Sequence, residues 1–237
     1  MLFDNPAERL RVILDNGRRI KQELPCRKAW DDLLDVKPGD NDDLFAKLGK
    51  AMALPRQTYL LLQTNFPAQV AGAEYWRSQV SNAFTNQNIS GNWGTFIAHV
   101  DPQCIAHLGL TAELIQAKIA TRLVPDQDLE RIQSEIHSLS SDVDGSDLSM
   151  HLKNYLAREL GELQQAIRDY KVSGAVPILK QTESMVGHAL LDPEYSSFIT
   201  SHALGKRLLD NLNAAAAILT VALQLPQLGQ AFAALLK

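Results

Sequence analysis

The chain has few of the residues and patterns that would assign it to a familiar class. Its two cysteines, Cys26 and Cys104, are too few for a disulfide framework and fit a reducing compartment, so we expect a cytoplasmic protein. The first residues lack a basic segment followed by an apolar one, which argues against a signal peptide. The sequence contains no phosphate-binding loop, dinucleotide-binding glycine pattern, zinc-protease motif or nucleophile elbow. No enzyme class is therefore indicated, and we expect no cofactor.

Residues that favour β-strands are also scarce. The chain has 36 Leu and 27 Ala, against 33 Ile, Val and Thr together. Leucine and alanine favour helices, whereas the β-branched residues favour strands. We therefore predict an all-α fold, a multi-helix bundle of about ten or more helices. With 46% hydrophobic and 21% charged residues, the composition is that of an ordinary globular protein.

Prolines, capping residues and apolar spacing indicate where the helices lie. The predicted ranges are 6–24, 26–35, 41–53, 56–65, 68–86, 111–123, 126–139, about 176–190 and from 192 onward, with breaks at Pro55, Pro67 and Pro125. The clearest element is a long central helix near 147–172. Its apolar residues recur every three or four positions and predict one buried stripe: Leu148, Leu152, Leu156, Leu160, Leu163, Ile167 and Tyr170.

The sequence favours one continuous helical body, residues 1–237. The polar segment 138–147 is the place where it would divide, into 1–139 and 147–237, although ten residues can equally form a surface loop. Charge is segregated: residues 1–28 carry seven Lys or Arg against four acids. We interpret this as a solvated helix face, with docking of an acidic partner as the alternative. The net charge of −4 argues against nucleic-acid binding.

The C-terminal residues 211–236 contain no charged side chain. The unbroken apolar part, 214–223, is ten residues long, whereas crossing a bilayer takes about 20. We therefore predict a buried apolar C-terminal helix and do not expect a membrane segment. An apolar stripe follows Pro226, and we predict that it docks on a protein partner or on a second copy of the chain; it includes Leu228, Phe232 and Leu235.

Two aromatic segments are candidate interaction sites. Tyr75, Trp76 and Arg77 are consecutive, and their residue types are those enriched at interface hot spots. Trp93 lies near the end of the polar, glycine-containing segment 85–94, and such loops often carry recognition. The alternative, that Trp93 packs into the core, stays open at this stage.

His99, Cys104 and His107 are weak candidates for metal ligands. Imidazole and thiolate groups suit Zn²⁺, which takes four such ligands in structural sites. Only three lie together here, and the helix start at Asp101-Pro102 separates His99 from the other two. We therefore prefer core packing and predict no metal site.

Arg131 and His137 form an Arg-x-x-x-x-x-His pattern, which resembles the one used by some helical ribonucleases of the HEPN class. The resemblance implies that the histidine acts as acid or base and that the arginine stabilises phosphate charge. About one such match is expected by chance in a chain of this composition. Acidic residues around the pattern would also repel an RNA backbone.

These observations favour a non-enzymatic helical interaction protein: a subunit, an adaptor or an oligomer-forming regulator. Its partner would be another protein or a second copy, bound through the C-terminal helices. The alternatives are an effector enzyme such as a HEPN-like ribonuclease, or a membrane-perturbing, toxin-like protein that uses 211–236.

Overall fold

The protein is all-α, as the composition predicts. The structure, a computed structural model, describes residues 3–224. Within this range it forms a multi-helix bundle of twelve α-helices, ten of them with seven or more residues, and contains no strand. None of these helices combines the length and the apolar character that crossing a bilayer requires.

The chain divides into two compact units. The first comprises the residues up to Thr121 together with Lys171–Ser173, and the second comprises Arg122–Tyr170 and the residues from Gly174 onward. The observed division therefore falls at Thr121–Arg122 and not in 138–147. Most of the segment 138–147 belongs to α7 (Asp126–Asp144), in which Leu139 and Val143 are buried.

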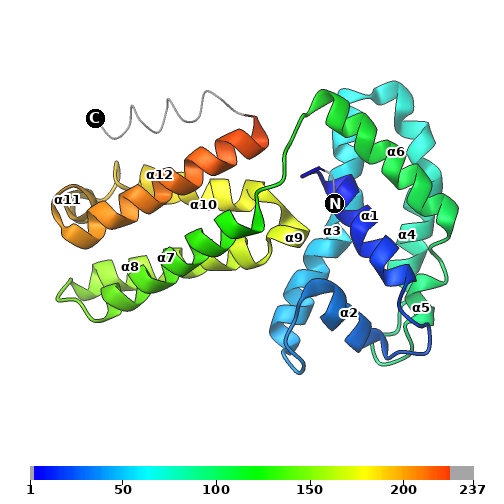
Figure 1. The fold of residues 1–237 in the computed structure, drawn as a ribbon, viewed down its shortest axis with the longest axis horizontal. Helices are drawn as coiled ribbons and strands as arrows, with labels where there is room; N and C mark the ends of the chain where they lie inside the picture. The colour runs from blue at the N-terminus through cyan, green and yellow to red at the C-terminus, as the bar shows by residue number, and fades with distance from the viewer. Residues whose placement is uncertain (1–2, 225–237) are drawn as a thin grey trace. The chain divides into compact units, whose positions relative to one another are not determined.

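The first unit contains six α-helices and one 3-10 helix among its described residues (Figure 1). They are α1 (Pro6–Arg18), α2 (Cys26–Leu34), α3 (Asn41–Asn65), η1 (Pro67–Ala73), α4 (Glu74–Asn86), α5 (Gly94–Ile97) and α6 (Pro102–Lys118). The helix starts follow the capping signals in the sequence. The side chain of Asn5 accepts a hydrogen bond from the amide of Glu8, and Asp101 does the same for Cys104.

Aromatic side chains fill the core of the first unit. All three tryptophans, Trp30, Trp76 and Trp93, are fully buried. The rings of Trp30 and Trp93 meet edge to face with centroids 5.1 Å apart, and Phe96 lies within 4.9 Å of both. This cluster connects α2 to the segment that precedes α5.

The second unit is built from helices with a single apolar stripe. It contains α7, α8 (Met150–Arg168), α10 (Ala175–His188), α11 (Pro193–Ser201) and α12 (Ala203–Leu223); the short α9 (Tyr170–Ser173) straddles the boundary in sequence. The stripe predicted near 147–172 is confirmed along α8, where Leu152, Leu156, Leu160, Leu163 and Ile167 are buried. Leu148 precedes α8 and is half-buried, and Tyr170 is buried at the start of α9. The C-terminal helix is buried along Leu208, Leu212, Ala215 and Leu219, while Ala217 and Val221 on its other side are exposed.

Pro55 does not break a helix, contrary to the sequence-based expectation. α3 runs without interruption from Asn41 to Asn65 with Pro55 inside it. Proline removes one hydrogen bond and usually kinks or ends a helix. Here the buried residues on either side, Leu54 and Thr58 among them, hold both halves of α3 on the same core.

Candidate functional site

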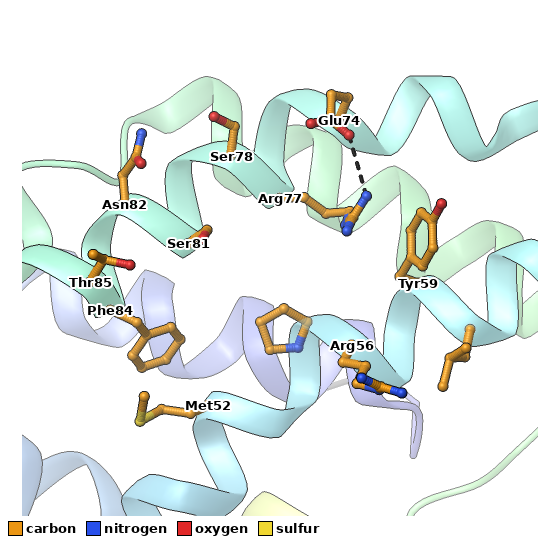
Figure 2. A pocket seen from close by; sticks show the side chains of 12 residues that line it. Met52, Arg56, Tyr59, Glu74, Arg77, Ser78, Ser81, Asn82, Phe84 and Thr85 are labelled. Carbon is orange, nitrogen blue, oxygen red and sulfur yellow. Dashed lines mark hydrogen bonds and ion pairs between the residues drawn. The ribbon is translucent and has the colours of Figure 1, made fainter.

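A groove of about 840 Å³ lies between α3 and α4 in the first unit (Figure 2). This volume lies within the range of ligand-binding pockets. Its α3 wall consists of Met52, Pro55, Arg56, Tyr59 and Leu60. Its α4 wall consists of Glu74, Arg77, Ser78, Ser81, Asn82, Phe84 and Thr85. We call this feature the α3–α4 groove.

Helical spacing explains why these side chains gather on one side. Met52, Arg56 and Tyr59 are four and three residues apart and share one face of α3, while Leu54 and Leu62 on another face are buried. On α4, Ser78, Ser81, Asn82 and Thr85 follow the same spacing. The opposite face of α4 buries Trp76, Val80 and Ala83 in the core. The core thus fixes both helices and leaves one polar wall and one mixed wall to line the groove.

Positive charge is concentrated at the end of the groove where Tyr59 and Glu74 lie (Figure 2). The guanidinium carbon of Arg77 lies 3.7 Å from the centre of the Tyr59 ring, and its Nη1 lies 3.3 Å from a carboxylate oxygen of Glu74. The Glu74 side chain is 74% exposed, so this ion pair is weak and easily exchanged. Arg56 is exposed, and no carboxylate in the described part of the chain pairs with it.

The polar groups that line the groove are able to form hydrogen bonds with a ligand. The guanidinium groups donate, and the hydroxyl and amide groups both donate and accept. The lining contains neither histidine nor cysteine, so none of its serines has an imidazole base beside it. The arrangement suits recognition of a polar, acidic ligand.

The residues that the sequence predicted as interaction sites differ in their exposure in the structure. Arg77 lines the groove, whereas Trp76 and Trp93 are fully buried and are not available as surface anchors. Trp93 packs into the core, the reading that the sequence left open, and backbone hydrogen bonds tie the end of segment 85–94 to 22–26. The Trp93 amide donates to the Leu24 carbonyl at 2.7 Å. Leu228, Phe232 and Leu235 lie outside the described residues.

Tyr75 is half-buried, does not line the groove and contacts the start of α6. Its hydroxyl donates to the carboxylate of Asp101, which also caps α6. This hydrogen bond raises the pKa of Tyr75 to about 12 and lowers the pKa of Asp101. Tyr75 therefore has a structural partner of its own.

The three weak metal candidates do not form a site. Cys104 is buried, and its thiol donates to the carbonyl of Trp76. Burial raises the pKa of the Cys104 thiol to about 12. The ring of His107 packs against Tyr75, with centroids 5.3 Å apart. Across residues 3–224, no group of three ligand-type side chains is placed to hold a metal ion.

Arg131 and His137 are both exposed on α7 but do not share a face of the helix. At 100° and 1.5 Å per residue, six residues separate them by about 120° around the helix and about 9 Å along it. Arg131 pairs with Asp128, one turn earlier. An acid–base group and a phosphate-binding group would need to meet at one reacting atom.

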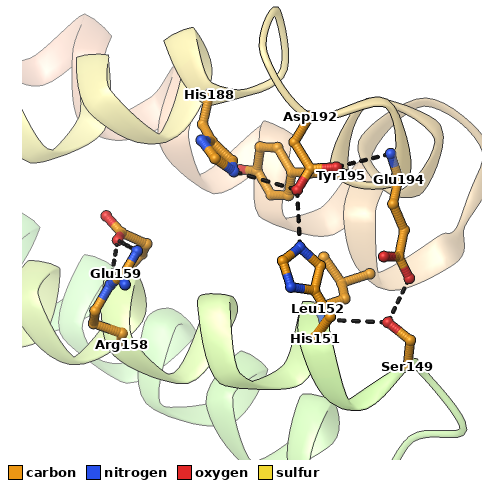
Figure 3. Close-up of polar contacts among 9 residues, drawn as sticks. All are labelled: Ser149, His151, Leu152, Arg158, Glu159, His188, Asp192, Glu194 and Tyr195. Atoms are coloured by element: carbon orange, nitrogen blue, oxygen red, sulfur yellow. Dashed lines mark hydrogen bonds and ion pairs between the residues drawn. The ribbon is translucent and has the colours of Figure 1, made fainter.

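A second polar cluster, which the sequence did not indicate, lies in the second unit (Figure 3). The carboxylate of Asp192 caps α11 by accepting from the amides of Glu194 and Tyr195. Its Oδ2 also lies 3.2 Å from Nε2 of His151 and 3.4 Å from Nε2 of His188. The hydrogen bonds from the Tyr195 amide and from His151 lower the pKa of Asp192.

Comparison with known proteins adds no functional information. The chain matches no protein-family model, and neither the curated proteins nor the solved structures gave a significant match.

The sequence missed the groove because its two walls come from helices that show no unusual motif. Arg56, Tyr59 and Ser81 are ordinary residues for an exposed helix face. Only the packing of α3 against α4 brings them together. The one available signal was the run of hydroxyl and amide residues at helical spacing, Ser78, Ser81, Asn82 and Thr85.

Proposed function

We propose that this chain is a non-enzymatic helical interaction protein and that its α3–α4 groove binds a short acidic segment of a protein partner. The observation that carries the proposal is the charge of the groove. Two guanidinium groups, on Arg56 and Arg77, line it, and Glu74 is the one carboxylate among the lining residues. An acidic segment would pair with Arg56 and displace Glu74 from Arg77. Charge-assisted hydrogen bonds of this kind are among the stronger polar contacts in proteins.

The dimensions of the groove fit a short segment. At 1.5 Å per helical residue, the α3 wall spans about 12 Å from Met52 to Leu60, and the α4 wall about 16 Å from Glu74 to Thr85. This length holds two to three turns of a helix or about four to five extended residues. Met52 and Leu60 are about half exposed and offer apolar contact beside the charges. The preferred ligand therefore has an apolar side chain next to its carboxylates.

A displayed library of random 12-residue peptides, selected on the full chain, tests this proposal. We expect enrichment of peptides in which Asp or Glu flanks an apolar residue. The Arg56→Glu variant should weaken their binding by about tenfold or more, because it reverses a charge at the contact. Lys21→Glu is the matched control, since Lys21 is an exposed cation of the same unit and does not line the groove.

The selection also has results that contradict the proposal. Failure to enrich acidic peptides would refute the proposed ligand. Acidic peptides that bind Arg56→Glu as tightly as the original chain would place their site elsewhere. Circular dichroism of both variants confirms that each keeps its helices.

Association through the C-terminal helices is a second candidate contact. Val221 is 63% exposed on α12, in the part of the uncharged segment that the structure describes. A homo-oligomer formed there would cover this face. Light scattering on the full chain, on a version that ends at Leu225 and on Val221→Asp separates the cases. Monomers in all three samples would rule out this contact.

A further inference from the structure

Three large apolar side chains are exposed at one end of the second unit. Met150 and Leu190 are each 70% exposed, and Leu191 is 81% exposed. Single exposed apolar residues are common on protein surfaces, but several together mark interaction sites. Met150 begins α8, and Leu190 and Leu191 lie between α10 and α11.

Polar contacts hold the two segments that carry them against each other (Figure 3). Ser149 donates a hydrogen bond to the carboxylate of Glu194, and His151 contacts Asp192. Met150 lies between Ser149 and His151, and Leu190 and Leu191 directly precede Asp192. We call Met150, Leu190 and Leu191 the tip surface.

Contacts among α8, α10 and α11 hold the backbone beneath the tip surface in place. Asp192 caps α11 and contacts one histidine from α8 and one from α10. The ring of His188 also stacks on Tyr155 of α8, with centroids 4.1 Å apart. A surface held in this way loses little conformational entropy when a partner binds.

The rim of the tip surface is acidic. Segments 144–153 and 189–194 contain four acidic residues and one lysine. That lysine, Lys153, donates through Nζ to the carbonyls of Asp144 at 3.1 Å and Ser146 at 2.5 Å, at the end of α7. Asp144, Asp147 and Glu194 are all exposed. An apolar centre with an acidic rim complements a partner that is apolar on one side and basic around it.

We propose that the tip surface binds a basic amphipathic helix of a protein partner. Apolar residues at helical spacing on the partner pack on Met150, Leu190 and Leu191, and its lysines and arginines pair with the rim. The acidic rim disfavours an anionic lipid surface, which attracts basic rather than acidic proteins. This contact is independent of the α3–α4 groove, which takes a ligand of the opposite charge.

A defined peptide tests the proposal on the full chain. The probe is a labelled 14-residue amphipathic helix of leucine and lysine, with binding followed by fluorescence anisotropy. We expect Leu191→Asp to weaken binding by about tenfold or more, because it places a charge in the apolar centre. Leu110→Asp is the matched control: Leu110 is 66% exposed, lies on α6 of the first unit, and should leave binding unchanged.

A charge exchange tests the rim. The double variant Asp144→Lys/Asp147→Lys should bind the leucine–lysine peptide more weakly than the original chain does. It should bind the leucine–glutamate counterpart of that peptide instead. Both aspartates are exposed, and a lysine at position 144 is compatible with the dipole at the C-terminal end of α7, so the variant should stay folded.

Four results would overturn the proposal. The first two are that the leucine–lysine peptide does not bind, or that its binding survives Leu191→Asp. The others are that the leucine–glutamate peptide binds the unmodified chain equally well, or that the chain binds phosphatidylserine vesicles through Leu191 but does not bind the peptide.

Discussion

The indole N–H of Trp93 donates a hydrogen bond to the carbonyl of Gly17 at 2.8 Å, across 76 positions of the sequence. The ring lies so close to α1 that a Cβ on Gly17 would fall 2.9 Å from Cζ2 of Trp93. Gly17 is therefore a glycine because the tryptophan occupies the space of a side chain. This contact commits Trp93 to the core and connects α1 to the segment before α5.

Gly17→Ala should destabilise the first unit by about 1–3 kcal/mol, because the fully buried ring cannot move aside without disturbing its neighbours. Gly49→Ala is the matched change in α3, where a Cβ would meet nothing within 4 Å. It should stabilise by about 0.5–1 kcal/mol, since alanine is the better helix former. All three tryptophans belong to the first unit, so urea unfolding followed by tryptophan fluorescence reports on it. Equal effects of the two changes would argue against the Trp93 contact.

In the second unit, Gly205 of α12 lies even closer to its neighbour, the backbone of α11. A Cβ there would lie 2.0 Å from the carbonyl oxygen of Phe198, so α11 and α12 would have to separate. We expect Gly205→Ala to destabilise this unit by about 3 kcal/mol or more. Gly161→Ala on α8, where a Cβ meets nothing, should instead stabilise by about 0.5–1 kcal/mol. Amide hydrogen exchange measured on α11 and α12 distinguishes the two outcomes; unchanged protection in Gly205→Ala would contradict the close contact.

The hydrogen bond between Tyr75 and Asp101 makes stability depend on pH at both ends of the range. The raised pKa of Tyr75 contributes stability below its unfolded value near 10, and this is lost as pH rises through about 12. The lowered pKa of Asp101 contributes stability above its unfolded value near 4, and this is lost as the carboxylate is protonated. Tyr75→Phe should remove the alkaline loss and raise the Asp101 pKa toward its ordinary value. An Asp101 pKa in Tyr75→Phe that NMR finds unchanged would show that the bond does not set it.

Asp192 should make the second unit sensitive to acid. Its pKa is lowered, so its charge stabilises the folded state above the unfolded pKa near 4 and stops doing so as pH falls through the folded value. Asp192→Asn keeps a good capping side chain but carries no charge. We therefore expect Asp192→Asn to unfold more easily than the original chain near pH 6 and to lose less stability between pH 6 and pH 3. Thermal unfolding across this range provides the measurement; parallel pH profiles for the two proteins would contradict the role of the carboxylate.

The sequence predicted those parts of the fold that depend on local signals. The leucine spacing of α8 and the caps at Asn5 and Asp101 identified helices correctly, because helix starts and buried stripes follow from neighbouring residues. Pro55 misled because tertiary packing on both sides held α3 together.

The candidate sites depend on contacts that no local pattern encodes. Trp93 could be assigned to the core only once its partner Gly17 was known. Arg56 and Ser81 lie 25 positions apart, and His151 and Asp192 lie 41 apart. Residue type alone selected Trp76 as a surface anchor, although the spacing of α4 turns it inward.

Amide hydrogen exchange on the full chain, with and without the most enriched acidic peptide, tests the central claim most directly. If the α3–α4 groove is the binding site, the peptide should slow exchange along 52–60 of α3 and 74–85 of α4, and this protection should disappear in Arg56→Glu. Protection confined to other segments, or protection that persists in Arg56→Glu, would contradict the account.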